Sequence, residues 1–154
     1  MSAEYELVLT RLIDVPRDKL YRCWTEAALL KQWFAPVPVT TPIAELDVRV
    51  GGACRIVMQL PDGTQIPTLG TYLEVQPDAR LVFTDAYTGE WRPKTDGPPF
   101  MTAILTFEEE SGNTRYTARV RHWTAEDRRR HEEMGFYRGW GQCTDQLAEL
   151  ARRI

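Results

Sequence analysis

The stretch VPRDKLYRCWTEAALLKQWF, residues 15–34, predicts two short helices in close succession. Pro16 is tolerated in the first turn of a helix, and Leu20 and Trp24 then lie four residues apart on one helical face. The second helix begins near Ala27 and adds four large apolar side chains: Leu29, Leu30, Trp33 and Phe34. Both helices are therefore expected to pack aromatic and aliphatic side chains into one core.

Strand patterns lie on both sides of these helices. Residues 4–14 alternate along the chain as a strand with both faces partly covered. Six further strand-like runs follow the helices, at about 43–50, 52–60, 66–75, 80–86, 101–109 and 113–122. Because tight turns separate successive runs, as at Gly51-Gly52 and Pro61-Asp62-Gly63, the sequence predicts an antiparallel meander. The turn at Gly51-Gly52 accounts for the two glycines that follow Asp47, so these glycines do not indicate a nucleotide-binding loop.

The pattern changes to helix from Thr124 onward. Thr124 can cap the helix, and the acidic residues after it complement the positive end of the helix dipole. An apolar face with a spacing of three and four continues to the C-terminus: Tyr137, Trp140, Gly141, Thr144, Leu147, Ala148 and Ala151. We expect one long helix here, gripped by a curved sheet.

Composition limits the function classes. The 154 residues, 43% of them hydrophobic, fit a single domain spanning 1–154. A net charge of -3 argues against a nucleic-acid or anionic-membrane partner, and the basic run 128–130 is flanked by acidic residues, as on a solvated helix face. Three widely spaced cysteines and the lack of an apolar N-terminal segment predict free thiols in the cytoplasm, and no metal site is expected.

Seven fragments carry a family resemblance that extends over nearly the whole chain. They are LYRCWTE, LLKQWF, Asp47 with Gly51-Gly52, PDGT at 61–64, GTYLEV at 70–75, RLVFT at 80–84, and GFYRGWGQCTDQLAEL at 135–150. In their order and spacing, the chain resembles the SRPBCC or START-like helix-grip superfamily. Within it, the chain is similar to the family related to the C-terminal domain of the activator of heat-shock protein 90 ATPase. The resemblance implies an α+β fold in which a curved antiparallel sheet of about seven strands wraps around a long C-terminal helix, with two short helices after the first strand and a cavity between sheet and last helix.

Besides the family resemblance, the glycines near the start of the last helix are compatible with a cavity. Gly135, Gly139 and Gly141 disfavour a helix, so they make room for a ligand, allow a kink, or let the helix approach the sheet; the sequence leaves all three open. Apolar, aromatic and sulfur-containing residues offer a lining for a small-molecule pocket: Trp33, Met58, Tyr72, Phe83, Trp91, Met101, Met134, Tyr137 and Trp140. The same residues would also describe a filled core.

Few polar residues are placed for catalysis. Tyr72, Asp85 and His122 are the candidates, although none belongs to a recognisable catalytic motif. His131 is assigned to a charged helix face and Cys143 to the core as a small buried residue. The polar insertion 87–100, with Trp91, either covers the cavity or forms a dimer surface.

The leading hypothesis is a protein that binds a small apolar or aromatic molecule, without a cofactor, rather than an enzyme. A homodimer is expected, as is common in the family that the chain resembles. Two alternatives remain. One is a cyclase- or hydrolase-like enzyme for an aromatic or polyketide-type substrate, as in some members of the superfamily. The other is a chaperone-activating or other partner-binding module, which the expectation of a single domain disfavours.

Overall fold

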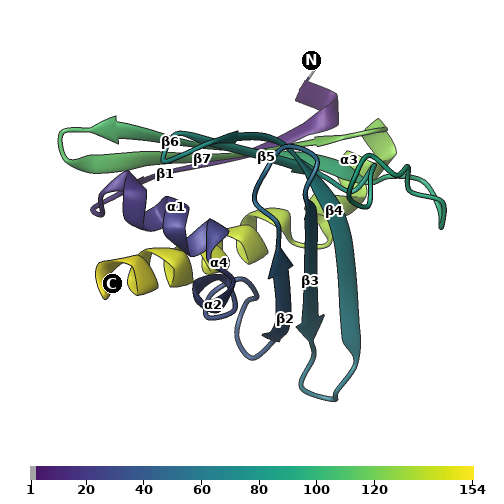
Figure 1. Ribbon diagram of the computed structural model, residues 1–154, viewed down its shortest axis with the longest axis horizontal. Coiled ribbons are helices and arrows are strands. Elements are labelled where there is room, and N and C mark those ends of the chain that lie inside the picture. The colour runs from purple at the N-terminus through teal and green to yellow at the C-terminus, as the bar shows by residue number, and fades with distance from the viewer. Residues whose placement is uncertain (1–2) are drawn as a thin grey trace.

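A computed structural model describes residues 3–154 as an α+β fold (Figure 1). The first half comprises η1 (Ala3–Tyr5), β1 (Glu6–Ile13), α1 (Arg17–Thr25), α2 (Ala27–Leu30), β2 (Thr40–Leu46) and β3 (Ala53–Gln59). The second half comprises β4 (Gln65–Gln76), β5 (Arg80–Thr84), β6 (Met101–Glu110), β7 (Asn113–His122), α3 (Ala125–Glu133) and α4 (Phe136–Arg152). The predicted order of strands and short helices is confirmed, with strand ends shifted by a few residues.

Within residues 3–154 the seven strands form one antiparallel sheet in the order β1-β7-β6-β5-β4-β3-β2. The sheet is strongly bent: β1, β6 and β7 run across the top of Figure 1, whereas β2, β3 and β4 turn downward from them. The register of β4 against β5 shifts between Tyr72 and Glu74. Such a bulge bends a strand and increases its twist, so it helps the sheet to curve.

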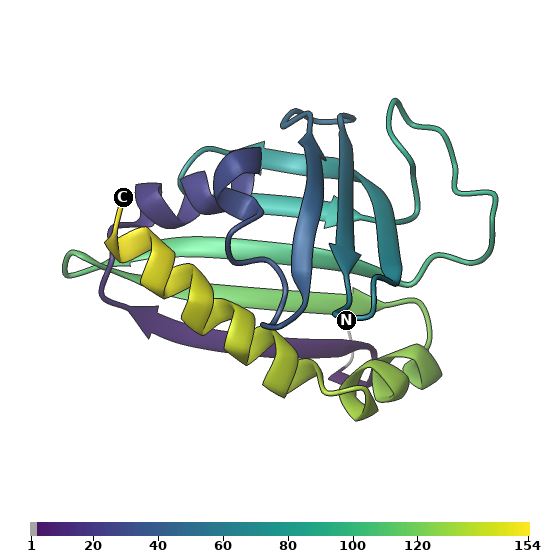
Figure 2. The same ribbon diagram turned by 90° about the horizontal axis from the view of Figure 1, so that it is seen from below.

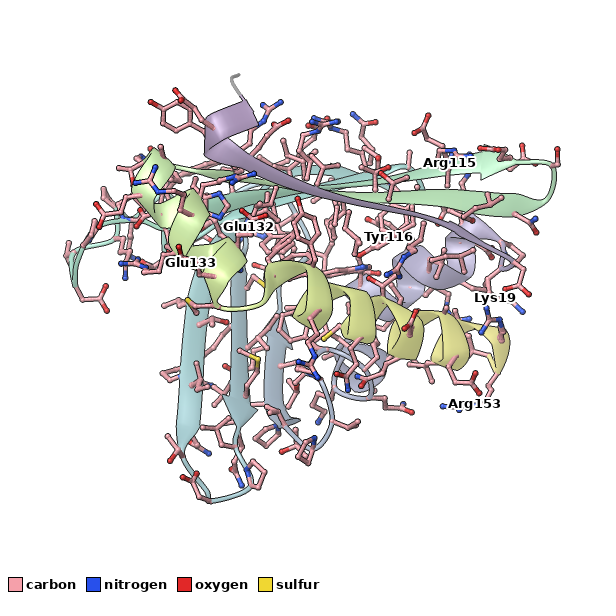
Figure 3. All side chains as sticks on the ribbon, turned by 180° about the vertical axis from the view of Figure 1, so that it is seen from behind. Lys19, Arg115, Tyr116, Glu132, Glu133 and Arg153 are labelled. Atoms are coloured by element: carbon pink, nitrogen blue, oxygen red, sulfur yellow. The ribbon has the colours of Figure 1, made fainter. Side chains whose placement is uncertain are left out.

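Alternation along the strands separates the two faces of the sheet. Every second residue of β7 is buried, as expected for a strand with one face on the core. Figure 3 shows Tyr116 on the helix side of β7 and Arg115 on the opposite face. The outer face carries ion pairs, among them Arg119 and Arg121 with Glu6. The concave face is therefore the one that receives the helices.

The core lies between this concave face and helices α1, α2 and α4, which all lie on the same side of the sheet (Figure 2). Leu147 and Ala151 of α4 are fully buried, so the C-terminal half of this helix packs tightly. The Trp24 and Trp33 rings meet edge to face, 4.7 Å apart, and Trp33 Nε1 donates to the Cys23 carbonyl. Aromatic pairs of this geometry fix α1 and α2 against each other.

The expected single C-terminal helix is instead two helices. Thr124 caps α3 as predicted, because its hydroxyl accepts a hydrogen bond from the Asp127 N–H. The chain breaks at Gly135, whose φ of 99° lies in the left-handed region that favours glycine, and α4 begins at the next residue. Tyr137, which is 45% exposed, lies outside the buried face, and Phe136 is buried instead. From Gly141 onward the predicted face is confirmed, since Gly141, Thr144, Leu147, Ala148 and Ala151 are buried. Of the three explanations for Gly135, the kink is the one observed.

Candidate functional site

A cavity of about 850 Å³ lies between the curved sheet and the N-terminal half of α4. From the sheet, its lining includes large apolar side chains on β3, β4, β5, β6 and β7: Met58, Ile66, Phe83, Met101 and Tyr116. The aromatic residues Trp24, Trp33 and Phe34 close it on the side of α1 and α2. Large side chains therefore surround this space without filling it.

Small residues on α4 help to keep the space open. Gly139 and Cys143, four residues apart on one face of α4, both line the cavity, as does Gly135 in the turn before this helix. A Cβ atom added to Gly139 would meet nothing within 4 Å. Phe136 and Trp140 flank this face and complete the helical wall.

The segment between β5 and β6 forms another wall. Thr88, Lys94, Asp96 and Phe100 of this segment line the cavity. Its end is fixed by Asp85, whose carboxylate accepts hydrogen bonds from the N–H groups of Phe100 and Met101 at 2.9–3.1 Å.

The middle of the same segment is held by the turn that precedes β3. Trp91 packs directly over Gly51, where an added Cβ would come within 2.9 Å of the indole nitrogen. Arg49 forms an ion pair with Glu90, beside Trp91. Gly51 has a φ of 85°, so the glycine pair is used for a turn, as the sequence indicated. The Trp91 side chain nevertheless remains half exposed.

Six of the nine residues proposed as lining do line the cavity: Trp33, Met58, Phe83, Met101, Met134 and Trp140. Tyr72, Trp91 and Tyr137 are placed elsewhere. Tyr72 is buried beside the Cys54 thiol. Trp91 stacks edge to face on Tyr87, and Tyr137 lies near the surface against Phe136. The residue types and the strand-like runs indicated apolar lining positions, but they could not locate the strand bulge or place the loop.

The three catalytic candidates are not brought together. Only Asp85 lines the cavity, and its carboxylate is engaged in holding the loop. Burial raises the pKa of Tyr72, so its phenol stays protonated. His122 is 3% exposed and lies behind His131, where Nδ1 is 3.0 Å from the Tyr5 carbonyl oxygen and Nε2 is 2.9 Å from His131 Nδ1.

His131 is a lining residue that the sequence interpretation missed. It was assigned to a charged, solvated helix face, but α3 turns it inward between the rings of Phe100 and Phe136, with centroids 5.2 and 5.1 Å away. Burial is the main cause that lowers the pKa of His131, to about 4, and the nearby His122 lowers it further. The signal in the sequence was an aromatic ring isolated among charged residues on this helix.

Tyr116 is another lining residue that the sequence interpretation missed. The alternation of β7 places it on the same face as Ala118 and Val120, which would have identified it as inward-facing. Its hydroxyl accepts a hydrogen bond from Trp24 Nε1 at 3.2 Å, and burial raises its pKa.

Other chemistry has little support in the described part of the chain. Among residues 3–154, no cluster of three metal-ligating side chains occurs. Burial raises the pKa values of Cys23 and Cys54 to about 11 and that of Cys143 to about 12, so these free thiols are protonated and poorly nucleophilic at neutral pH. Cys143 is only partly buried, because it borders the cavity. None of the helices in this range has the length and apolar character to cross a bilayer.

Comparison with known proteins identifies close structural relatives. The family model described as "Activator of Hsp90 ATPase homolog 1-like protein" matches residues 14–152. A crystal structure of a protein from Nitrosomonas europaea is 40% identical and superimposes with a TM-score of 0.94, covering 99% of this chain and 97% of that one. No curated protein matches the chain significantly.

More distant structures share the fold. A protein from Rhodobacter sphaeroides, 18% identical, has a TM-score of 0.85 and covers 100% of this chain and 97% of its own. A solution structure described as an "AHSA1-like protein" from Aeromonas hydrophila, 16% identical, has a TM-score of 0.71 with coverages of 96% and 92%. The arrangement of sheet and helices is thus retained where little sequence identity remains.

Proposed function

Since this chain belongs to the family of Activator of Hsp90 ATPase homolog 1-like proteins, within the helix-grip superfamily, we propose that it binds a small apolar or aromatic molecule between its sheet and its C-terminal helix. The observation that carries this proposal is the cavity of about 850 Å³, which is within the size range of small-molecule sites. Its walls supply aromatic rings and thioethers, which suit a flat apolar ligand.

Binding is favoured over catalysis by the arrangement of polar groups. Tyr72, Asp85 and His122 would have to converge on one reacting atom to act together. Tyr72 and His122 lie outside the lining, and Asp85 is occupied by backbone N–H groups. The cavity therefore offers shape and apolar surface more than a catalytic cluster.

Native mass spectrometry of freshly purified protein is the first test. A mass that co-purifies and disappears on denaturation would identify a ligand directly. A thermal-shift series with biphenyl and related aromatic compounds follows, because a ligand that binds only the folded state raises its stability. A protein without any bound mass or shift would contradict the proposal and favour a partner-binding module.

A substitution in the cavity wall tests whether the ligand binds in this cavity. In Gly139→Leu, the new side chain extends from a lining position with free space around it, so it should occupy part of the cavity and weaken biphenyl binding at least tenfold while the protein stays folded. Gly139→Ala is the matched control, since it adds one methyl group and should bind nearly as well. Equal biphenyl affinity in both variants would place the ligand elsewhere.

The native mass spectra of the purified protein also report its oligomeric state. We propose a homodimer with Trp91, half exposed on the loop, as a candidate contact, and a dimer mass that is lost in Trp91→Ser would support this surface. The cytoplasm is our proposed location, and the three free thiols are compatible with a reducing compartment.

A further inference from the structure

Tyr116 is a lining residue of the cavity, and its hydroxyl group has a hydrogen atom to donate. An indole N–H can only donate, so in the 3.2 Å hydrogen bond between Trp24 Nε1 and Tyr116 Oη the tyrosine is the acceptor. No acceptor for the Tyr116 hydrogen occurs among residues 3–154. Both residues line the cavity. A buried donor without a partner is unfavourable, so a ligand acceptor at this point would be stabilised.

His131 offers the complementary group, a free acceptor. The Tyr5 carbonyl can only accept, so His122 Nδ1 must carry the hydrogen in their 3.0 Å contact. Burial lowers the pKa of both histidines, so both are neutral at pH 7 and each has one N–H. His122 Nε2 is therefore unprotonated and accepts from His131 Nδ1 at 2.9 Å. This leaves His131 Nε2 unprotonated, without a hydrogen-bond donor in the described part of the chain.

The charged side chains along the lining are already engaged. Arg55 pairs with Glu45 at 2.9 Å and Lys94 with Asp96 at 2.6 Å. The Asp85 carboxylate accepts from two backbone N–H groups. An ionised ligand would lose its hydration without meeting a free counter-charge, which disfavours it strongly. The cavity therefore selects neutral molecules.

The two free groups are held at different positions along β7. The Cα atoms of Tyr116 and His122, six residues apart on the same face of this strand, are about 20 Å apart at strand spacing; the side chains that extend from the strand set the distance between the groups themselves, and His131 adjoins His122. The cavity lining between them is mainly apolar and aromatic.

Resting on the proposed function, we infer that the ligand is an elongated, neutral aromatic molecule with an acceptor such as a carbonyl at the Tyr116 end and a hydroxyl group at the His131 end. The Tyr116 hydroxyl donates to the carbonyl, and His131 Nε2 accepts from the hydroxyl. The rings between these two groups pack against the aromatic walls.

Four biphenyl probes test this assignment by calorimetry or thermal shift. Biphenyl carries neither polar group. 4-Acetylbiphenyl carries the carbonyl acceptor, 4-hydroxybiphenyl carries the hydroxyl donor, and 4-acetyl-4′-hydroxybiphenyl carries both. We expect each group to tighten binding about fivefold, the effect of one net hydrogen bond. Equal affinities for all four would leave cavity binding standing and overturn the assignment. Failure of all four to bind would contradict the proposed function itself.

Two variants assign each group to its residue. In Tyr116→Phe the gain from the acetyl group should vanish while the gain from the hydroxyl group remains. In His131→Phe the reverse should hold. The ratios between probes are measured within one protein, so a general loss of stability does not produce this pattern. If either variant keeps both gains, the corresponding contact is wrong; if a variant does not fold, the four affinities of the unmodified protein still decide.

Discussion

The His131 side chain lies 2.9 Å from His122 Nε2, enclosed by the rings of Phe100 and Phe136. The residues next to His131 do not predict this inward-facing position, because its neighbours on α3 are charged: Arg129, Arg130, Glu132 and Glu133. Periodicity alone did not predict the cavity wall here, because the helix has almost no apolar residues to mark its inner face. An isolated aromatic ring on a charged helix was the available signal.

The partly buried His131 makes stability depend on pH. Its folded pKa of about 4 lies below the ordinary histidine value of 6.5, so between these values the unfolded chain binds more protons and stability falls as pH falls. We expect a loss on the order of 2 kcal/mol on moving from pH 7 to pH 4, allowing for partial exposure. Urea unfolding at pH 7, 6 and 5 would measure it, because carboxylates with lowered pKa values, such as Asp14 and Glu110, act mainly below this range.

His131→Phe is the control for this pH dependence. The slope of stability between pH 7 and pH 5 should be smaller in the variant, and the remainder should come from His122, whose pKa is also lowered by burial. An unchanged slope would mean that His131 is not shielded from water in the way the structure shows.

At the scale of elements, the break between α3 and α4 determines the site, because it directs the small-residue face of α4 toward the cavity. The sequence marked Gly135, Gly139 and Gly141 as unusual but could not assign each one, because propensity does not record φ. Gly135 makes the turn, Gly139 borders free space, and Gly141 is buried with Arg11 Nη2 3.0 Å from an added Cβ. The three glycines, one just before α4 and two within it, thus have three different roles.

Alanine at two of these glycines should act in opposite directions. Gly135→Ala places a side chain at a φ of 99°, so we expect the protein to lose about 1–2 kcal/mol. Gly139→Ala replaces a helical glycine where a methyl group meets no neighbour, so we expect a gain of about 0.5–1 kcal/mol. Chemical denaturation of both variants measures the difference, and a shift of the same sign in both would contradict the helix break.

At the scale of the whole molecule, the fold followed from sequence because its signals repeat. The strand-like runs, the glycine turns between them and the aromatic helices at 15–34 agree on an antiparallel sheet with two short helices after its first strand. The family resemblance implied the curvature of this sheet around the last helix. The cavity lining was partly predictable for the same reason, as inward-facing positions such as Met58 and Met101 show. Hydrogen-bond partners joining distant elements, such as Trp24 with Tyr116, require the assembled structure. The loop after β5 has no periodic pattern of apolar residues, so its position as a wall of the cavity could be identified only from its contacts in the structure.

Shortening that loop tests how the whole molecule retains a ligand. Thr84 of β5 pairs with Thr102 of β6 and Asp85 lies opposite Met101, so a two-residue Asn-Gly turn can replace residues 86–100 and still join the strands. We expect the sheet to persist at a cost of about 1–3 kcal/mol, because the buried Thr71 hydroxyl loses its 2.6 Å hydrogen bond from the Gly89 N–H. Circular dichroism and thermal melting would check both points before any binding measurement.

The shortened protein should release its ligand faster, since one wall of the cavity is gone. Dissociation of 4-hydroxybiphenyl, followed by its fluorescence after dilution, should accelerate about tenfold, because changes in affinity at one site fall mainly on dissociation. Ser111→Asn, in the hairpin turn between β6 and β7, is the matched control: it alters a turn that does not line the cavity and should leave the rate unchanged. If the shortened protein folds and releases the probe at the original rate, the loop does not enclose the site, and Trp91 is better explained as part of an interface between two copies of the chain.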